Sequence, residues 1–156
     1  MSALNQTCTE GATPTILVVD DNKGVLDFLL LLLSKHQFAA VGASSGSQCL
    51  QIVQSQHVDL IILDVMMPVM DGLQVCQELK KLAPSIPVIL LTARDDMMTR
   101  AAAMDLGVSE FVAKPVNNRD LLNRVRTQLR SLELGKANDQ VFSEIERTAR
   151  SPTNKT

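Results

Sequence analysis

The chain has 156 residues, a net charge of −2 and 46% apolar residues, with no Trp, no Tyr and only four Phe. This length suits one domain with a sizeable core, and the core must be mainly aliphatic. A protein that binds nucleic acid non-specifically needs a basic surface. The charge balance therefore excludes that class, and no direct contact with nucleic acid is expected.

Neither a secretory signal nor a membrane span is predicted. Residues 1–14 are polar and lack the basic and apolar regions of a signal peptide. The apolar run over residues 28–33 is far too short to cross a bilayer. The cysteines, Cys8, Cys49 and Cys76, form no metal-type pair, so reduced thiols in a cytoplasmic protein are expected.

Short apolar runs alternate along the chain with stretches of helical periodicity. The runs predict strands over residues 16–19, 38–43, 59–63, 87–91 and 110–114. The periodic stretches predict helices over residues 23–35, 47–56, 72–83, 96–106 and from 118 through 132. Strands that alternate with helices predict a parallel α/β sheet covered on both faces. A closed barrel would need about 250 residues, so an open, doubly wound sheet is favoured.

Local signals mark several helix ends. Asp71 is expected to cap the helix that Pro84 stops, and Gly107 to close the helix over residues 96–106. The leucine-rich helix over residues 23–35 is apolar on more than one side, which predicts a helix largely covered by its neighbours. We expect a domain over residues 15–134, a disordered segment over 1–14, and a partly helical or disordered segment over 135–156.

Polar side chains stand where four of the predicted strands end. Asp20 and Asp21 follow the first strand, Asp64 the third, Thr92 the fourth, and Lys114 ends the fifth. Because the carboxyl ends of parallel strands share one edge of the sheet, these side chains are expected to converge in one crevice.

This set of residue types points to phosphoryl chemistry. Clustered carboxylates repel one another unless positive charge lies between them, and Lys114 supplies part of that charge. Mg²⁺ suits carboxylate ligands, whereas zinc is not expected because no Cys or His stands at a strand end. A carboxylate nucleophile, a metal, a lysine and a hydroxyl donor together match transfer of a phosphoryl group.

The motifs at these strand ends resemble those of response-regulator receiver domains (CheY-like) of two-component phosphorelay signalling. The resemblance covers about residues 15–134. The matching pieces are residues 18–22 (VVDDN), 64–68 (DVMMP) with 71–72 (DG), 92–93 (TA), and 111–115 (FVAKP). The family's fold is flavodoxin-like, which implies the strand order 2-1-3-4-5.

The resemblance also implies a role for each acidic residue. Asp64 would be the phospho-acceptor and would take a phosphoryl group from a phosphohistidine. Asp21, Asp64 and the backbone carbonyl of Met66 would bind Mg²⁺ directly, and Asp20 would act mainly through water.

Three further residues complete the implied site. Lys114 would pair with the phosphoryl oxygens and precede a cis bond to Pro115. Thr92 would move its hydroxyl toward the phosphoryl group, and Phe111 would swing inward as the second switch residue. In the family the side chains at Met66 and Arg94 modulate the lifetime of the phosphoryl group, so Met66, which cannot orient a water, predicts slow self-dephosphorylation.

Structural interpretations stand beside these roles. Thr92 alone also fits a simple strand end, and periodicity alone favours Phe111 as a fixed core aromatic. Asp71 is expected to act as a helix cap, and His36 and His57 to have no catalytic role.

Two other functional classes remain open. An aspartate phosphatase or phosphotransferase usually has a second acid two residues after its nucleophile, but Met66 holds that position and cannot donate a proton. A pseudo-receiver would bind partners without phosphorylation, although the complete set of acids, threonine and lysine speaks against it. The favoured reading is a signalling protein, not an enzyme.

The implied partners are a sensor histidine kinase or phosphotransfer protein and a downstream protein. Residues 135–156 are too few for an output domain, so output by protein contact is expected. The helix over 96–106, the strand over 110–114 and the helix from 118 form the expected switch surface and a possible homodimer interface. It offers the opposite charges Asp95, Asp96 and Asp105, and Arg119, Arg124, Arg126 and Arg130.

Overall fold

The computed structural model describes residues 13–93, 96–108 and 110–132. The predicted Arg94, Asp95 and Cys8, and the segment over 135–156, lie outside these residues. The strands are β1 (Thr15–Val19), β2 (Ala39–Ala43), β3 (Leu60–Asp64), β4 (Val88–Ala93) and β5 (Glu110–Lys114). The helices are α2 (Lys23–Lys35), α3 (Gly46–Ser55), α4 (Gly72–Leu82), α5 (Met97–Asp105) and a further helix over 118–132.

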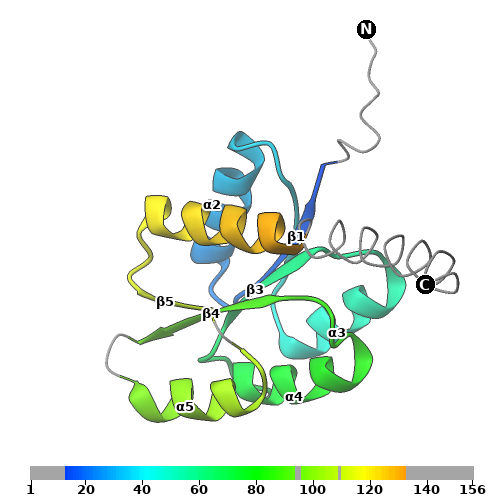
Figure 1. Ribbon diagram of the computed structural model, residues 1–156, viewed down its shortest axis with the longest axis vertical. Helices are drawn as coiled ribbons and strands as arrows, with labels where there is room; N and C mark the ends of the chain where they lie inside the picture. Colours follow the sequence, from blue (N-terminus) through cyan, green and yellow to red (C-terminus); the bar gives the residue numbers. More distant parts are fainter. Residues whose placement is uncertain (1–12, 94–95, 109, 133–156) are drawn as a thin grey trace, which may run out of the picture.

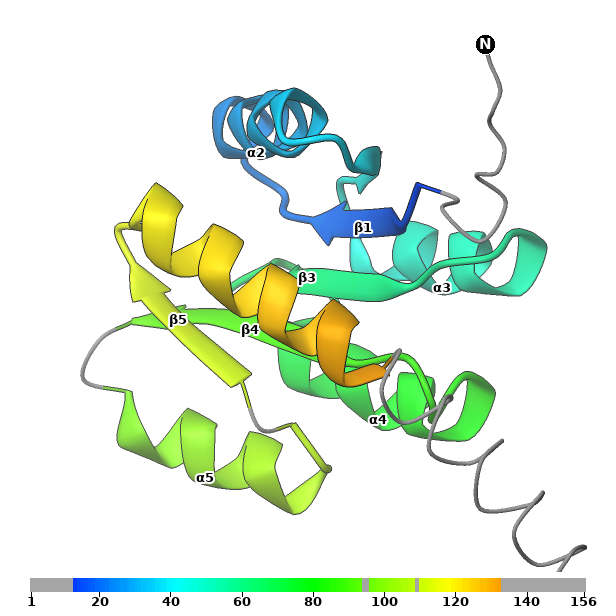
Figure 2. The same cartoon turned by 45° about the horizontal axis from the view of Figure 1, so that its top comes forward.

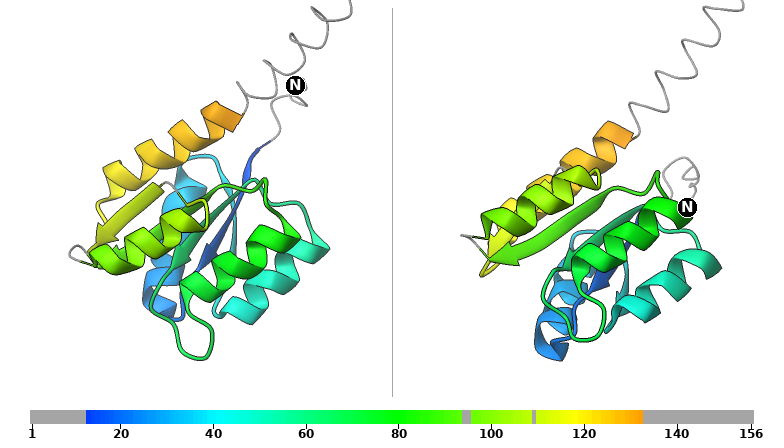
Figure 3. Two further views of the ribbon diagram at one scale, coloured as in Figure 1. Left: turned by 60° about the horizontal axis from the view of Figure 1, so that its bottom comes forward. Right: turned by 90° about the horizontal axis from the view of Figure 1, so that it is seen from below.

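The strands form one parallel sheet in the order β2-β1-β3-β4-β5, which confirms the predicted α/β fold and its topology. Figures 1 and 2 show α2 and the 118–132 helix over one face, and α3, α4 and α5 over the other. In both views of Figure 3, α3 and α4 lie side by side.

Each face of the sheet carries its own apolar cluster, because side chains alternate along a strand. Leu17 and Val19 of β1 pack on the side of α3, α4 and α5, while Ile16 and Val18 pack on the side of α2 and the 118–132 helix. The central strand β3 is buried along its whole length. A strand covered on both faces must be apolar throughout, which explains why its sequence is a continuous apolar run.

Short-range hydrogen bonds to side chains cap the first turns of the helices. The side chain of Asn22 caps α2, that of Ser45 caps α3, and Asp71 caps α4 in a capping box with Gln74. Gly107 follows α5 with φ of +93°, so its predicted left-handed conformation is confirmed.

Some details differ from expectation. Thr92 lies within β4 because the strand extends to Ala93, and Asp64 is the last residue of β3 instead of following it. The covering of α2 is also incomplete, since Phe28 and Leu31 are about half exposed. Over the described residues, none of the helices combines the length and the apolar character that crossing a bilayer requires.

Candidate functional site

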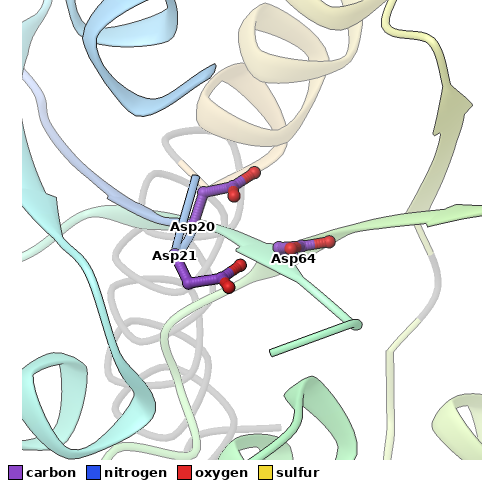
Figure 4. Close-up of side chains that lie close together, drawn as sticks. All are labelled: Asp20, Asp21 and Asp64. Carbon is purple, nitrogen blue, oxygen red and sulfur yellow. The ribbon is translucent and has the colours of Figure 1, made fainter. Parts of the chain in front are cut away.

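The carboxyl ends of β1 and β3 bring three carboxylates together. Asp20 and Asp21 directly follow β1, and Asp64 is the last residue of β3, the neighbour of β1 in the sheet. One oxygen from each carboxylate lies within 4.8 Å of the others. Figure 4 shows the three carboxylates extending to the same side of the strand ends. Asp20 and Asp64 are buried, whereas Asp21 is exposed.

Lys114 is the cation of this cluster. Its Nζ donates to Asp64 Oδ1 at 2.8 Å and lies 3.6 Å from Asp20 Oδ2. Desolvation lowers the pKa of Lys114, but the hydrogen bond and charge of Asp64, with the charge of Asp20, outweigh it and raise the pKa. The Lys114 ammonium is therefore charged at neutral pH. Its peptide bond to Pro115 is cis, as the resemblance implies.

The position of Asp64 disfavours the ionised form of its carboxyl. Burial raises the pKa of its carboxyl, and the charge of Asp20 raises it further. The hydrogen bond from Lys114 and a weaker one from the Met66 N–H, at 3.4 Å, lower the pKa but only partly offset the burial. An ionised Asp64 thus calls for more positive charge than Lys114 alone supplies.

The donor atoms of this cluster fit a hard divalent cation such as Mg²⁺. Asp20 Oδ1 accepts a hydrogen bond from the Asn22 N–H at 2.9 Å, while its buried Oδ2 has no hydrogen-bond partner within the described part of the chain. A buried carboxylate oxygen without a described hydrogen bond, 3.6 Å from the Lys114 ammonium and beside two more carboxylates, is suited to a cation. The described acid cluster contains only oxygen ligands, which favours magnesium over zinc. Asp20, Asp21 and Asp64 are the side chains that would hold the ion.

Thr92 is buried near the carboxyl end of β4, next to the acid cluster. The residue before it, Leu91, is the register partner of Asp64 on the adjoining strand β3. The Thr92 Oγ1 donates to the Ala93 carbonyl at 3.4 Å. Among the described contacts this hydroxyl makes no hydrogen bond to Asp64, so it is not engaged with the acid.

Phe111 lies one strand further along, on β5. Its ring packs against the apolar cluster under α5, in register with Leu90 of β4. The guanidinium of Arg100, on α5, lies over this ring with its Cζ 5.7 Å from the ring centroid. Phe111 is thus partly buried between the sheet and a cation.

The loop over residues 65–71 carries the backbone past the site. The Met66 side chain is 72% exposed, and Val69 at the tip is fully exposed with φ of +70°, a conformation that β-branched residues rarely adopt. The loop projects beyond the sheet in Figure 3. It returns at Gly72, whose N–H donates to the Val65 carbonyl at 2.8 Å. Asp71 caps α4 and belongs to this return, as predicted.

Each of the two histidines contacts a side chain outside the acid cluster. His57 Nε2 lies 2.7 Å from Asp59 Oδ1, and His36 Nδ1 lies 3.3 Å from the guanidinium of Arg126.

Two of the charges expected on the switch surface, those of Asp96 and Arg124, make contacts within the chain. Asp96 is the N-cap of α5 and accepts a hydrogen bond from the Thr99 N–H. Arg124 is bound within the chain, since it donates to Glu110 at 2.8 Å and to Asp120 at 3.1 Å. Arg124 is therefore already paired and is a poor candidate for an ion pair with a second copy.

Sequence reasoning placed Asp20, Asp21, Asp64 and Lys114 at one site, and the structure brings them together. It missed Arg100, which reaches Phe111 from another element. The one available signal is helical spacing, since Arg100 lies three residues before the buried Ala103 and so shares its inward side.

An open parallel sheet with an acid cluster and a lysine at its carboxyl edge defines a class of α/β protein with a ligand site at the strand ends. The family model described as "Response regulator receiver domain" matches residues 16–126, and the chain belongs to this family. It is therefore a receiver domain of the kind found in two-component signalling.

Similar proteins agree with this assignment. Over 118 residues the chain is 42% identical to a protein of Cyanophora paradoxa named "Probable transcriptional regulator ycf27", covering 76% of this chain and 49% of that protein. It is 39% identical over 119 residues to the response regulator MprA of Mycobacterium ulcerans, covering 76% of this chain and 51% of that one. The chain thus spans about half the length of these curated relatives.

Solved structures are similar over nearly their full length. A CheY-like receiver domain protein of Methanospirillum hungatei superposes with a TM-score of 0.76 at 25% identity, covering 80% of this chain and 99% of that one. A receiver domain protein of Clostridium thermocellum gives a TM-score of 0.73 at 31% identity, covering 78% and 98%.

Proposed function

We propose that this protein takes a phosphoryl group onto Asp64 from a phosphohistidine of a sensor kinase or phosphotransfer protein, in a reaction that requires Mg²⁺. The observation that carries the proposal is the 2.8 Å bond from Lys114 Nζ to Asp64 Oδ1, within a cluster of three carboxylates. Relatives at 39–42% identity are named as response regulators or a transcriptional regulator.

The transfer step is a displacement at phosphorus. A carboxylate oxygen of Asp64 forms a bond to phosphorus while the bond from phosphorus to the donor imidazole nitrogen breaks, and its electron pair leaves with the imidazole. Lys114, already bonded to Asp64, is placed to neutralise the oxygens of the incoming phosphoryl group. Magnesium, when bound by Asp20, Asp21 and Asp64, would supply further positive charge there.

Movements of the Thr92 and Phe111 side chains would couple phosphorylation of Asp64 to a change at the protein surface. Among the described residues, the Thr92 hydroxyl makes one long hydrogen bond, to the Ala93 carbonyl at 3.4 Å, which it would break on turning. Turning toward the phosphoryl group would leave space that the ring of Phe111 fills. The affected surface is formed by α5, β5 and the 118–132 helix, and a downstream protein would bind there.

The exposed Met66 side chain is expected to lengthen the lifetime of the phosphoryl group on Asp64. A thioether has no strong donor or acceptor with which to orient a water molecule for attack on phosphorus. We therefore expect slow loss of the phosphoryl group, with a half-life well above seconds for the isolated protein with Mg²⁺. A half-life of seconds would contradict this role of Met66.

The direct test is intact-mass spectrometry after incubation with acetyl phosphate. One labile phosphoryl group is expected with Mg²⁺, and none with EDTA or in Asp64→Asn. Asp71→Asn is a matched control, because it makes the same chemical change beside the site and Asn still caps a helix. Rapid release of phosphate from small esters would favour the phosphatase, and no adduct under any condition would favour the pseudo-receiver.

A further inference from the structure

The contact between Arg100 and Phe111 joins α5 to β5 next to the proposed switch. The guanidinium Cζ lies 5.7 Å from the ring centroid, within the range of a cation–π interaction. The Arg100 Nε is buried and has no hydrogen-bond partner among residues 13–93, 96–108 and 110–132. The aromatic face of Phe111 is thus a described contact of the guanidinium, whose charge also interacts with that of Asp96 at the start of α5.

The strand register shows where the ring can go. Leu90 is opposite Phe111, and Thr92 is opposite Ala113. Alternate residues of a strand share a face, so Phe111, Ala113 and Thr92 all face α5. Ala113 has only a methyl group, and a ring that turns along β5 toward Thr92 therefore meets no large side chain on its own strand.

Movement of the ring toward Thr92 would take it away from Arg100. The guanidinium would then lose its aromatic partner while its Nε stayed without a described acceptor. A half-buried cation that loses its aromatic partner is less favourable in that position, so Arg100 would turn outward. Met97 and Met104, three residues before and four residues after Arg100, are more than half exposed, so the cation would join an apolar stretch of the α5 surface.

We propose that the orientation of the Arg100 side chain depends on the position of the Phe111 ring. Phosphorylation of Asp64 then frees the Arg100 guanidinium to bind a partner protein at the surface of α5. This inference rests on the proposed function. Arg100 acts through Phe111 and does not touch the acid cluster, which makes it a positioning residue rather than a catalytic one. The expected partner surface is apolar and carries a carboxylate.

Nuclear magnetic resonance of arginine Nε–H groups tests the contact in the native chain. The Arg100 signal, assigned with Arg100→Lys, should lie upfield because the ring of Phe111 shields it. It should move toward the signals of exposed arginines when beryllofluoride and Mg²⁺ occupy the site. Phe111→Leu should remove the upfield shift in both states. An Arg100 signal that stays upfield with beryllofluoride bound overturns the proposal.

A binding cycle tests the energetic coupling. If the Arg100–Phe111 contact stabilises the resting form, Arg100→Met should tighten beryllofluoride binding by about two- to fivefold, the change expected for an exposed cation–π contact. The same substitution in a Phe111→Leu background should have no effect, because the ring is gone. Arg119→Met, at an exposed arginine of the 118–132 helix, is the matched control and should leave the affinity unchanged.

The two proposals fail in different ways. If the native protein binds no beryllofluoride and gains no phosphoryl group at Asp64, the proposed function fails and the coupling fails with it. If beryllofluoride binds and Arg100→Met changes its affinity equally with and without the Phe111 ring, only the role of Arg100 is refuted.

Discussion

Gly72→Ala should destabilise the protein far more than a single methyl group suggests. A Cβ at this position would lie 2.7 Å from the carbonyl oxygen of Asp64 and 2.8 Å from Cα of Val65. Non-bonded carbons normally stay at least about 3.5 Å apart, so the overlap is roughly 0.7 Å. The atoms it meets are backbone atoms at the end of the central strand, which cannot turn aside as a flexible side chain does.

Two backbone hydrogen bonds hold this region in place. The Gly72 N–H donates to the Val65 carbonyl at 2.8 Å, and the Val65 N–H donates to the Leu91 carbonyl of β4 at 3.1 Å. Relief of the overlap strains both. Overpacking costs about 1–3 kcal/mol and a weakened hydrogen bond about 1 kcal/mol, so the free energy of unfolding should fall by about 2–4 kcal/mol.

Urea denaturation followed by circular dichroism measures this loss, since the chain has no Trp for fluorescence. The midpoint should fall by roughly 1–2 M urea. Gly24→Ala is the matched control, because its Cβ would meet only the side-chain oxygen of Asn22 at 3.3 Å and alanine favours a helix. A Gly72→Ala variant within ~0.5 kcal/mol of the native protein would refute the reasoning, because it would show that the strand end yields freely.

Three further predictions concern the acids and thiols. In EDTA, Asp64→Asn should raise the free energy of unfolding at pH 7, measured by urea denaturation. Because the pKa of Asp64 is raised in the folded protein, protonation of Asp64 stabilises the fold. This stabilisation is fully present below the ordinary pKa of 3.8 and is lost as pH rises through the folded-state pKa. If Asp64→Asn is no more stable than the native protein and its stability depends on pH in the same way, burial of Asp64 does not have this effect. Asp71→Ala should cost about 1 kcal/mol through loss of the cap of α4, whereas Asp71→Asn should cost little, and equal losses in the two variants would exclude capping as the cause. Burial raises the pKa of Cys49 to about 12 and that of Cys76 to about 11. A Cys8→Ser variant should therefore show no thiol reactive to Ellman's reagent at pH 8 until it is unfolded, and rapid reaction of the folded variant would contradict that.

Local features of the sequence determined the helices and strands, their order in the chain, and which residues stand at the strand ends. The alternation of apolar runs and helical periodicity predicted five parallel strands, because a strand buried on both faces has to be apolar along its length. Asp71 and Gly107 were predictable as helix ends, since capping involves residues only a few positions apart. The strand-end residues Asp20, Asp64 and Lys114 were predictable because all carboxyl ends of a parallel sheet meet at one edge.

The tertiary structure decided what depends on contact between distant segments. Lys114 meets Asp64 across 50 residues of chain, at a distance that only the sheet register sets. Arg124 is paired with Glu110 instead of being free, and Arg100 lies over Phe111. Helical spacing indicates only that Arg100 shares the inward side of α5 with Ala103, and it does not identify Phe111 as the partner. Spacing along the chain shows which edge or face a residue belongs to, but the choice among several possible partners follows from packing between elements.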